Sequence, residues 1–247
     1  MMTTLEAPAP PRSEIVYPSS DGKRMAENTK QLRWIVLLLT NIELLLAHLA
    51  DVLVAADLLW YPVEGEPGIS TAPDILVALG RPRGDRLSYL QWKEGDKPPQ
   101  VVFEILSPSN GYKEMADKLA FYDEHGVEEY YVYDPDRDTL SPYKRGRAAL
   151  VLQEVKGGVY VSPLLGLRFD LTGDEMTVHH PDGQRFLTVH ELQERRLAAE
   201  KAQAAAEKAQ ADTAQRMARL RDLSRRVRGG LASPEEIAEL DRLEAEG

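Results

Sequence analysis

Two isolated carboxylates and one lysine are the residues of this chain whose types and positions point to chemistry. Glu104 is the single charged residue of the segment 101–110, and apolar residues flank it on both faces of a predicted strand. Asp74 stands at the entry of a second apolar run, Ile75–Leu79. A carboxylate in a strand that is covered on both faces needs a cation or several hydrogen-bond donors, because burying an unpaired charge is costly.

We expect the two carboxylates to lie together on one face of a β-sheet, since the connection between their strands permits antiparallel pairing. At short range they would repel each other unless a hard cation lay between them, and oxygen ligands suit Mg²⁺ or Mn²⁺. Lys118 is the third candidate. In a predicted helix over 113–125 it shares a face with Tyr122. From there it would orient an attacking water or stabilise charge on phosphorus.

The composition limits where other chemistry could come from. The 247 residues include no cysteine, which excludes a disulfide framework, a thiolate metal site and a thiol nucleophile. The net charge of −10 argues against a passive nucleic-acid coat, because such proteins neutralise phosphates with Lys and Arg. Nearly all of the excess lies in the first 190 residues, where cations bound to carboxylates would reverse the local sign.

No segment indicates export or a membrane. The longest apolar run, over 34–49, is interrupted by Asn41, Glu43 and His48, which are costly at the centre of a bilayer. The first fourteen residues lack the basic start and the apolar core of a secretory signal. We therefore expect a cytoplasmic protein that has no membrane partner.

Short β-rich runs alternate with helices and must position the candidate residues. A helix is expected from Asn28 or Thr29, both good N-caps, to about Leu49. Residues 81–99 are expected to form a long loop, and Gly157-Gly158 a hairpin turn. The order predicts an α/β fold whose mixed sheet is flanked by helices, with the last three strands as an antiparallel extension of that sheet. The predicted strands are 52–54, 58–63, 75–79, 101–106, 130–134, 149–154, 159–161 and 176–178.

Composition divides the chain into three regions. Proline-rich sequence predicts an extended N-terminal arm over 1–20, followed by a domain over 21–190. Residues 191–247 are rich in Ala, Glu, Gln, Lys and Arg, and EKAQAAAEKAQ nearly repeats itself, so we predict a long helix. Its apolar stripe is thin, which favours coiled-coil pairing and a homodimer through this C-terminal helix.

Two local patterns mark the end of this region. Ser233-Pro234-Glu235-Glu236 predicts a capping box and a short terminal helix. Six arginines between positions 216 and 228, against Asp222, give a local charge of about +5. We interpret this basic stretch as a solvated helix face rather than as a phosphate-binding surface.

PDILVAL, FEILSPSN and DKLAFYDEHGVEEYYVYDP together resemble the Uma-type family of restriction endonucleases, in the PD-(D/E)XK nuclease superfamily. The resemblance runs from about Tyr17 to Glu191 and includes SDGKRMAEN and DLLWYPVEG. It implies a restriction-endonuclease-like fold with a four- or five-stranded mixed sheet. It also implies divalent-metal-dependent hydrolysis of phosphodiester bonds, with DNA as the partner.

The resemblance assigns roles to single positions. Asp74 matches the aspartate of PD, Glu104 the acidic residue of the second motif, and Lys118 a lysine placed on the following helix. Asp74 and Glu104 would then hold one or two Mg²⁺ or Mn²⁺ ions. Glu104-Ile105-Leu106 lacks a lysine at the usual position, so activity would depend on Lys118. For an additional acidic residue from the first helix, Glu27 is the first candidate and Glu43 the second.

Other interpretations stay open. A catalytically inactive DNA-binding or scaffold protein that retains the nuclease fold would account for the missing strand lysine. Glu104 could instead belong to a structural ion pair, and Asp74 could be a turn residue. Residues 107–110 could position a phosphate, although we expect them to cap the following helix. A glycosidase would use the two carboxylates as acid and base without a lysine. Convergence of Asp74, Glu104 and Lys118 in one cleft is the observation that separates these hypotheses.

Overall fold

The computed structural model describes residues 15–22 and 24–245, which form two compact units. The first unit ends at Leu187 and the second begins at Thr188. Residues 1–14 of the predicted arm lie outside the described residues. The remainder of that arm packs against the first unit, because the Tyr61 hydroxyl donates to the Pro18 carbonyl oxygen at 2.8 Å. The Tyr17 ring also lies against the rings of Tyr61 and Trp92.

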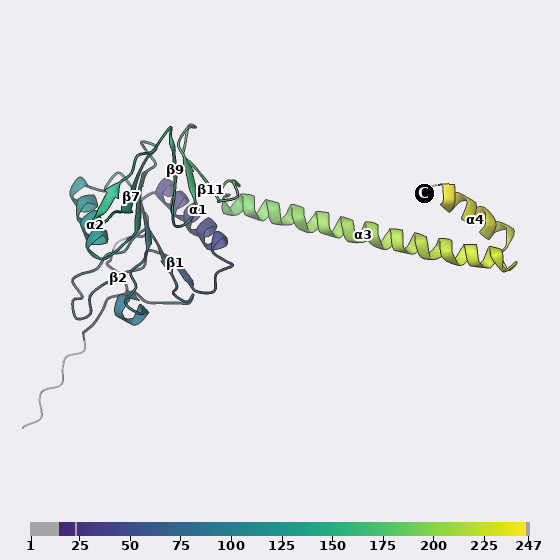
Figure 1. Ribbon diagram of the computed structural model, residues 1–247, viewed down its shortest axis with the longest axis horizontal. Helices are drawn as coiled ribbons and strands as arrows, with labels where there is room; N and C mark the ends of the chain where they lie inside the picture. The colour runs from purple at the N-terminus through teal and green to yellow at the C-terminus, as the bar shows by residue number, and fades with distance from the viewer. Residues whose placement is uncertain (1–14, 23, 246–247) are drawn as a thin grey trace, which may run out of the picture. The chain divides into compact units, whose positions relative to one another are not determined.

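A six-stranded mixed β-sheet forms the centre of the first unit (Figure 1). Of its neighbouring strands only β5 and β6 run parallel, and the other pairs are antiparallel. The four or five strands implied by the resemblance are too few, because β7 and β8 continue the sheet beyond β6. In spatial order the strands are β1 (Val52–Ala56), β3 (Ile75–Leu79), β5 (Val101–Ile105), β6 (Glu129–Asp134), β7 (Thr139–Arg145) and β8 (Leu150–Leu152).

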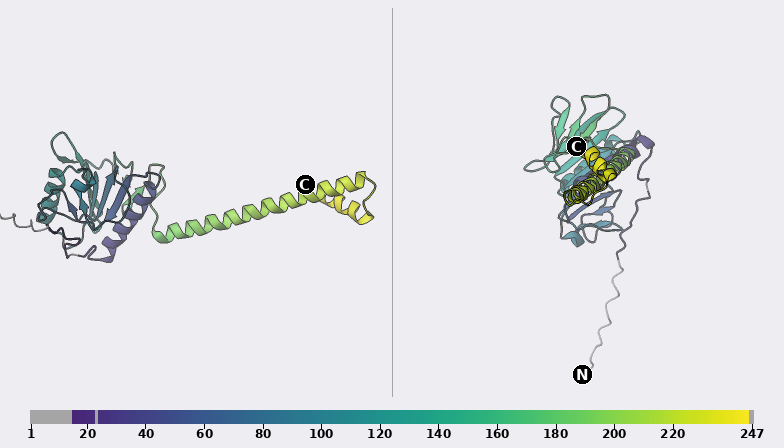
Figure 2. Two further views of the ribbon diagram at one scale, coloured as in Figure 1. Left: turned by 90° about the horizontal axis from the view of Figure 1, so that it is seen from below. Right: turned by 90° about the vertical axis from the view of Figure 1, so that its right-hand side faces the viewer.

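Helices α1 (Thr29–Leu45) and α2 (Tyr112–Glu124) cover opposite faces of this sheet (Figures 1 and 2). Successive side chains of β5 enter two separate cores, as its mixed apolar pattern predicted. Val101, Phe103 and Ile105 pack on the α1 side, whereas Val102 packs on the α2 side. Glu104 has the same parity as Val102 and therefore lies on the α2 side.

The N-terminus of α1 follows its predicted cap. The Asn28 side chain accepts a hydrogen bond from the backbone N–H of Gln31 at 2.8 Å, which satisfies one free donor of the first turn. The helix ends at Leu45, four residues before the expected end at Leu49. Gln31 then extends toward the sheet, and its side-chain amide donates to the backbone oxygen of Ile105 at 2.8 Å. This bond ties the start of α1 to the end of β5.

The predicted antiparallel extension of the main sheet is correct for its first strand, since β8 pairs antiparallel with β7, but wrong for the other two, because the last strands of the first unit form a sheet of their own. Strands β9 (Val159–Val161), β10 (Arg168–Asp170) and β11 (Thr177–His179) pair in the order β11-β10-β9. The turn expected at Gly157-Gly158 does form, since Lys156 and Val159 make an antiparallel bridge across it. It does not join the two predicted strands into a hairpin, because β8 pairs with β7 and β9 pairs with β10. Periodicity marks a strand but does not identify its neighbour.

The segment 81–99 contains more structure than the predicted loop. It holds β4 (Tyr89–Leu90) and a short 3-10 helix, η1 (Gln91–Glu94). Strand β4 pairs in parallel with β2 (Trp60–Tyr61), which is much shorter than the predicted strand over 58–63.

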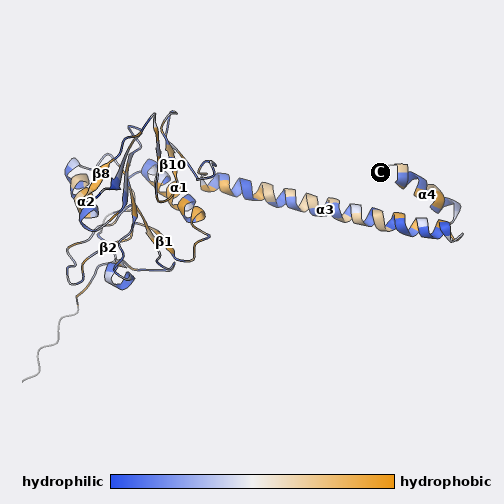
Figure 3. Ribbon diagram, viewed as in Figure 1, coloured by the Kyte–Doolittle hydropathy of each residue, from blue (hydrophilic) through white to orange (hydrophobic). Residues whose placement is uncertain are grey.

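The second unit consists of α3 (Val189–Arg228) and α4 (Pro234–Ala245). The predicted capping box is confirmed, since the Ser233 N–H donates to the Glu236 carboxylate at 2.9 Å and the Glu236 N–H to the Ser233 hydroxyl at 3.3 Å. Hydrophilic residues cover most of α3 (Figure 3). None of the described helices is long and apolar enough to cross a membrane.

Helix α4 folds back on the C-terminal end of α3, where Leu223 and Leu240 are buried. Arg219 donates two hydrogen bonds to the Glu239 carboxylate, at 2.9 and 2.7 Å. Arg226 lies 3.1 Å from Glu236. Part of the basic stretch is therefore paired with acidic residues of α4.

Candidate active site

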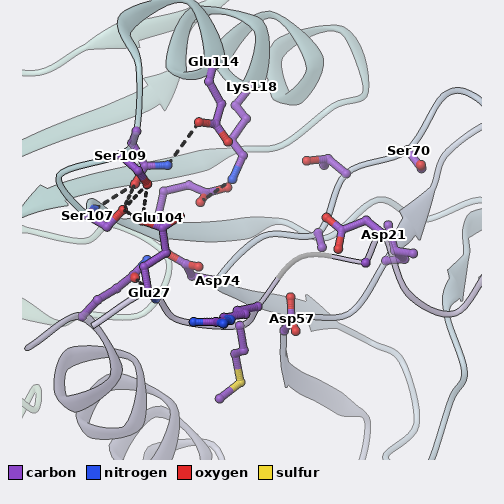
Figure 4. Close-up of a pocket in the computed structure, with 18 residues that line it drawn as sticks. Asp21, Glu27, Asp57, Ser70, Asp74, Glu104, Ser107, Ser109, Glu114 and Lys118 are labelled. Atoms are coloured by element: carbon purple, nitrogen blue, oxygen red, sulfur yellow. Dashed lines mark hydrogen bonds and ion pairs between the residues drawn. The ribbon is translucent and has the colours of Figure 1, made fainter. Parts of the chain in front are cut away.

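A cavity of about 820 Å³ opens where β3 begins and β5 ends (Figure 4). Asp74, Glu104 and Lys118 all line it, so the structure brings the three main candidates together. Glu27 lines the same cavity from the segment before α1. Glu43 does not. It lies on the exposed side of α1 and lines a separate, smaller pocket beside β1.

Glu104 is held at both carboxylate oxygens. Its side chain is almost fully buried, with 4% of its surface exposed. Oε2 accepts a hydrogen bond from Lys118 Nζ at 2.7 Å, and Oε1 accepts one from the Tyr122 hydroxyl at 2.6 Å. Lys118 and Tyr122 are four residues apart and so lie on the same face of α2. The α2 face that packs on the sheet therefore supplies both partners of Glu104.

The charge of Lys118 is stabilised by its surroundings. Burial acts to lower the pKa of this ammonium group. The neighbouring carboxylate and hydrogen bond of Glu104, together with the charge of Asp74, outweigh burial and raise the pKa above its usual value. Lys118 is therefore a cation at neutral pH and acts as a hydrogen-bond donor.

Asp74 meets Glu104 from the neighbouring strand. Its Oδ2 accepts a hydrogen bond from the backbone N–H of Ile105 at 2.6 Å. Burial, and after it the charge of Glu104, raise the pKa of Asp74 to about 8, against the opposing effects of the Ile105 N–H and Lys118. The two carboxylates thus do not ionise together easily without an added positive charge. A cation between them would favour the ionised form of both.

The loop between β5 and α2 connects Glu27 to the cavity. Glu27 Oε2 accepts hydrogen bonds from the hydroxyls of Ser107, at 2.9 Å, and of Ser109. The Asn110 side-chain oxygen accepts from the backbone N–H of Ser107 at 2.8 Å. The predicted cap over 107–110 is wrong. The N-cap of α2 is Gly111, and no side chain caps that helix because the loop's polar groups bind Glu27 and one another.

Two aspartates that were not among the predicted site residues lie on the opposite wall of the cavity. Asp57 follows β1 and Asp21 precedes α1, and both line the cavity. Asp57 has a φ of 51°, a left-handed conformation that Asp tolerates better than most residues. Burial, and then the charge of Asp21, raise the pKa of Asp57. Asp21 belongs to a turn pattern that does not distinguish it from other loop aspartates, whereas Asp57 is the single charged residue of the apolar run 52–63, a signal that could have found it.

The donor set fits a hard divalent cation whose protein shell is incomplete. Among the described residues, no group of three or more His, Asp or Glu side chains is arranged to hold a metal ion. Mg²⁺, however, is usually bound by one or two carboxylates and keeps several waters or substrate phosphates. Asp74 and Glu104 meet that requirement. The described lining of the cavity includes six carboxylate side chains and two basic ones, Arg24 and Lys118.

Comparison with known proteins identifies a family and solved structures that are similar to this chain. The model of the Uma2 family, described as "Putative restriction endonuclease", matches residues 14–179. The crystal structure of a "putative nuclease belonging to DUF820" from Anabaena variabilis is similar, with 16% sequence identity and a TM-score of 0.43. That similarity covers 57% of this chain and 75% of the other. No curated protein matches the chain.

Proposed function

Because this chain belongs to the Uma2 family of restriction-endonuclease-like proteins, we propose that it is a divalent-metal-dependent endonuclease that hydrolyses phosphodiester bonds in DNA. The proposal depends on one observation in particular. Asp74 and Glu104 line the same cavity, and Lys118 donates to Glu104 at 2.7 Å. Two carboxylates and a lysine from different elements form the donor set that such a reaction needs.

Asp74 and Glu104 are the residues that would hold Mg²⁺ or Mn²⁺. Such an ion, when bound, lowers the pKa of water and polarises phosphoryl oxygens. The charge of the cavity supports this requirement, since six carboxylates among its described lining would repel a nucleic-acid strand. A bound cation reverses that local sign.

Lys118 would act as a donor rather than as a base. Its raised pKa keeps the ammonium group protonated at neutral pH, so it has no free lone pair to accept a proton from water. From its position beside Glu104 it would orient the attacking water and stabilise negative charge on the phosphate. In this proposal, the helix lysine takes over the task that the strand lysine has in the superfamily motif.

Plasmid nicking in Mg²⁺ or Mn²⁺ tests the proposal. We expect the full chain to nick DNA and Glu104→Gln, which keeps the side-chain shape, to lose more than about 100-fold of that rate. Glu43→Gln is the matched control, because Glu43 lies on an exposed surface away from this cavity. A wild-type chain that neither nicks DNA nor binds Mn²⁺ would favour the inactive scaffold, and equal rates for both variants would remove Glu104 from the mechanism.

We also propose that the chain dimerises through α3. All residues from 193 to 215 are exposed, although this stretch contains seven-residue spacing in EKAQAAAEKAQ. A repeat of seven is the period of a left-handed supercoil, whereas a solitary helix does not require it. Ala202, Ala206, Ala209 and Thr213 follow the three-and-four spacing of such a seam.

Sedimentation of the full chain tests the dimer. We expect Ala206→Glu, on the seam, to produce monomers. Ala204→Glu introduces the same charge on the opposite side of the helix and should leave the dimer intact. A monomeric wild-type chain at micromolar concentration would overturn the proposal.

A further inference from the structure

Two buried tyrosines lie side by side behind Glu104, on the α2 face of the sheet. Tyr122 comes from α2 and is 0% exposed, whereas Tyr130 comes from β6 and is 1% exposed. Their ring centroids are 4.9 Å apart, and both belong to the same apolar cluster. Because their surroundings are so similar, any difference between them can be assigned to their hydroxyl groups.

The two hydroxyls differ in their partners. The Tyr122 hydroxyl donates to Glu104 Oε1 at 2.6 Å. The Tyr130 hydroxyl is buried and has no hydrogen-bond partner among the described residues. A hydrogen bond of this length to a carboxylate is of the strong, charge-assisted kind.

The Tyr122 ring cannot turn easily. It is stacked on Trp60, with an interplanar angle of 4°, and meets Phe121 edge to face. Lys118, the other partner of Glu104, reaches it on a flexible four-carbon stem. The phenol is therefore the more rigid of the two groups that hold the carboxylate.

We propose that Tyr122 is a positioning residue of the metal site, whose hydroxyl fixes the plane of the Glu104 carboxylate so that it faces Asp74 across the cavity. This inference rests on the proposed function. Tyr122 itself need not touch substrate or metal. Outer partners that orient a ligating carboxylate contribute to metal affinity, and their loss typically weakens binding 10- to 100-fold.

A pair of tyrosine-to-phenylalanine variants tests this role. Each variant removes one hydroxyl from the same buried cluster, in the full chain. For Tyr122→Phe we expect the dissociation constant of Mn²⁺, measured by calorimetry, to rise about 10- to 100-fold. For Tyr130→Phe we expect a dissociation constant within about twofold of wild type, because the lost hydroxyl has no partner.

The nicking rate provides a second readout that separates positioning from damage to the fold. At saturating Mn²⁺, Tyr122→Phe should recover to within a few-fold of the wild-type rate, whereas at low Mn²⁺ it should be far slower. The electron paramagnetic resonance spectrum of bound Mn²⁺ should also change in Tyr122→Phe and not in Tyr130→Phe. Rates are expressed per folded molecule at each Mn²⁺ concentration, because bound metal also stabilises the fold. A loss of folded protein alone would then leave the corrected rates equal to wild type.

The possible outcomes distinguish a failure of the proposed function from a failure of the positioning role of Tyr122. A wild-type chain that binds no Mn²⁺ overturns the proposed function and, with it, this inference. If wild type binds Mn²⁺ and Tyr122→Phe binds it equally tightly, only the role of Tyr122 is overturned. If Tyr122→Phe fails to fold, Phe121→Leu replaces it, since that change removes the edge-to-face contact that holds the Tyr122 ring. A wild-type dissociation constant in Phe121→Leu would then overturn the inference.

Discussion

Two glutamates are buried on neighbouring strands of the same sheet, and they are held in opposite ways. Glu129, on β6, is 1% exposed and accepts hydrogen bonds from three neutral donors: the Tyr131 hydroxyl at 2.8 Å, the Ser162 hydroxyl at 2.6 Å and the Leu164 N–H at 2.8 Å. Glu104, on β5, accepts from an ammonium group and a phenol, and it borders a cavity that it shares with Asp74.

The comparison shows that burial of a carboxylate does not by itself indicate chemistry. Glu129 lies in a closed shell of donors and points to the α1 side of the sheet, where it stabilises the contact between the two sheets. Glu104 lies beside a second carboxylate whose pKa is raised to about 8. That unfavourable pairing is what distinguishes a candidate active site from a structural one.

Replacing the lysine should show the largest difference between the two regions. We expect Lys118→Met to lower the nicking rate about 100- to 1,000-fold, because it removes the cation that would stabilise charge on the phosphate. Glu129→Gln should keep the rate per folded molecule within about threefold, since Glu129 does not line the cavity. Rates measured against the folded fraction check this. A strong loss of activity in Glu129→Gln would contradict the purely structural role of Glu129.

Added metal should stabilise the fold by binding at the candidate site, and this stabilisation should not depend on the donors that surround Glu129. At a Mn²⁺ concentration 100 times the dissociation constant, we expect the free energy of unfolding to rise by about 2.7 kcal/mol. Asp74→Asn should abolish this increase, whereas Ser162→Ala should retain it. Thermal unfolding with Mn²⁺ and with a chelator is the measurement. An equal increase in Asp74→Asn would exclude Asp74 as a ligand.

Without metal, Asp74 should destabilise the fold as pH rises. Its pKa is about 8 in the folded chain, against an ordinary value of 3.8, so between these values the unfolded chain releases the proton more readily. The contribution of this group to stability therefore falls as pH rises from about 4 to about 8.

Asp74→Asn removes that pH dependence. After allowing for partial exposure, we expect the variant to exceed wild type by on the order of 2 kcal/mol near pH 8, and by less near pH 5. Urea unfolding in a chelator measures the difference. If the free energy of unfolding of Asp74→Asn exceeded that of wild type by the same amount at both pH values, the raised pKa of Asp74 would be contradicted.

The smallest effect is expected at the structural glutamate. Ser162→Ala removes one of the donors to Glu129 and should lower the free energy of unfolding by about 1 kcal/mol, because the remaining donors still hold the carboxylate. The nicking rate should not change. Urea unfolding and plasmid nicking of the same preparation check both halves, and a change in rate without a change in stability would refute the structural role of this shell.

Local patterns in the sequence predicted most of the elements that position the candidate site. The strand over Ile75–Leu79 was predicted at its observed bounds, and the helix after Glu104 within one residue at each end. The cap at Asn28 and the capping box at Ser233 were also predicted correctly. Each of these features depends on residues within a few positions of one another, so the sequence contains the whole cause.

The sequence did not predict which strands become neighbours. Strands β9 to β11 have the alternation of any short strand, and only packing on the α1 side of the core separates them from the main sheet. The prediction of a cap over 107–110 was also wrong because of a contact with a distant segment. Ser107 and Ser109 have a partner in Glu27, some eighty residues away, and this contact competes with the helix end.

An isolated carboxylate in an apolar strand was enough to select Glu104, and the helical spacing of Lys118 to Tyr122, together with the family resemblance, selected Lys118. The same argument does not reach Glu129, which follows Glu128 and precedes the predicted strand over 130–134, and Asp21 and Asp57 were left out of the candidate site. Residue type and local spacing therefore determine where a charge must find a partner. Only the folded chain decides whether that partner is a closed shell of neutral donors or a second carboxylate across a cavity, because those groups come from distant segments.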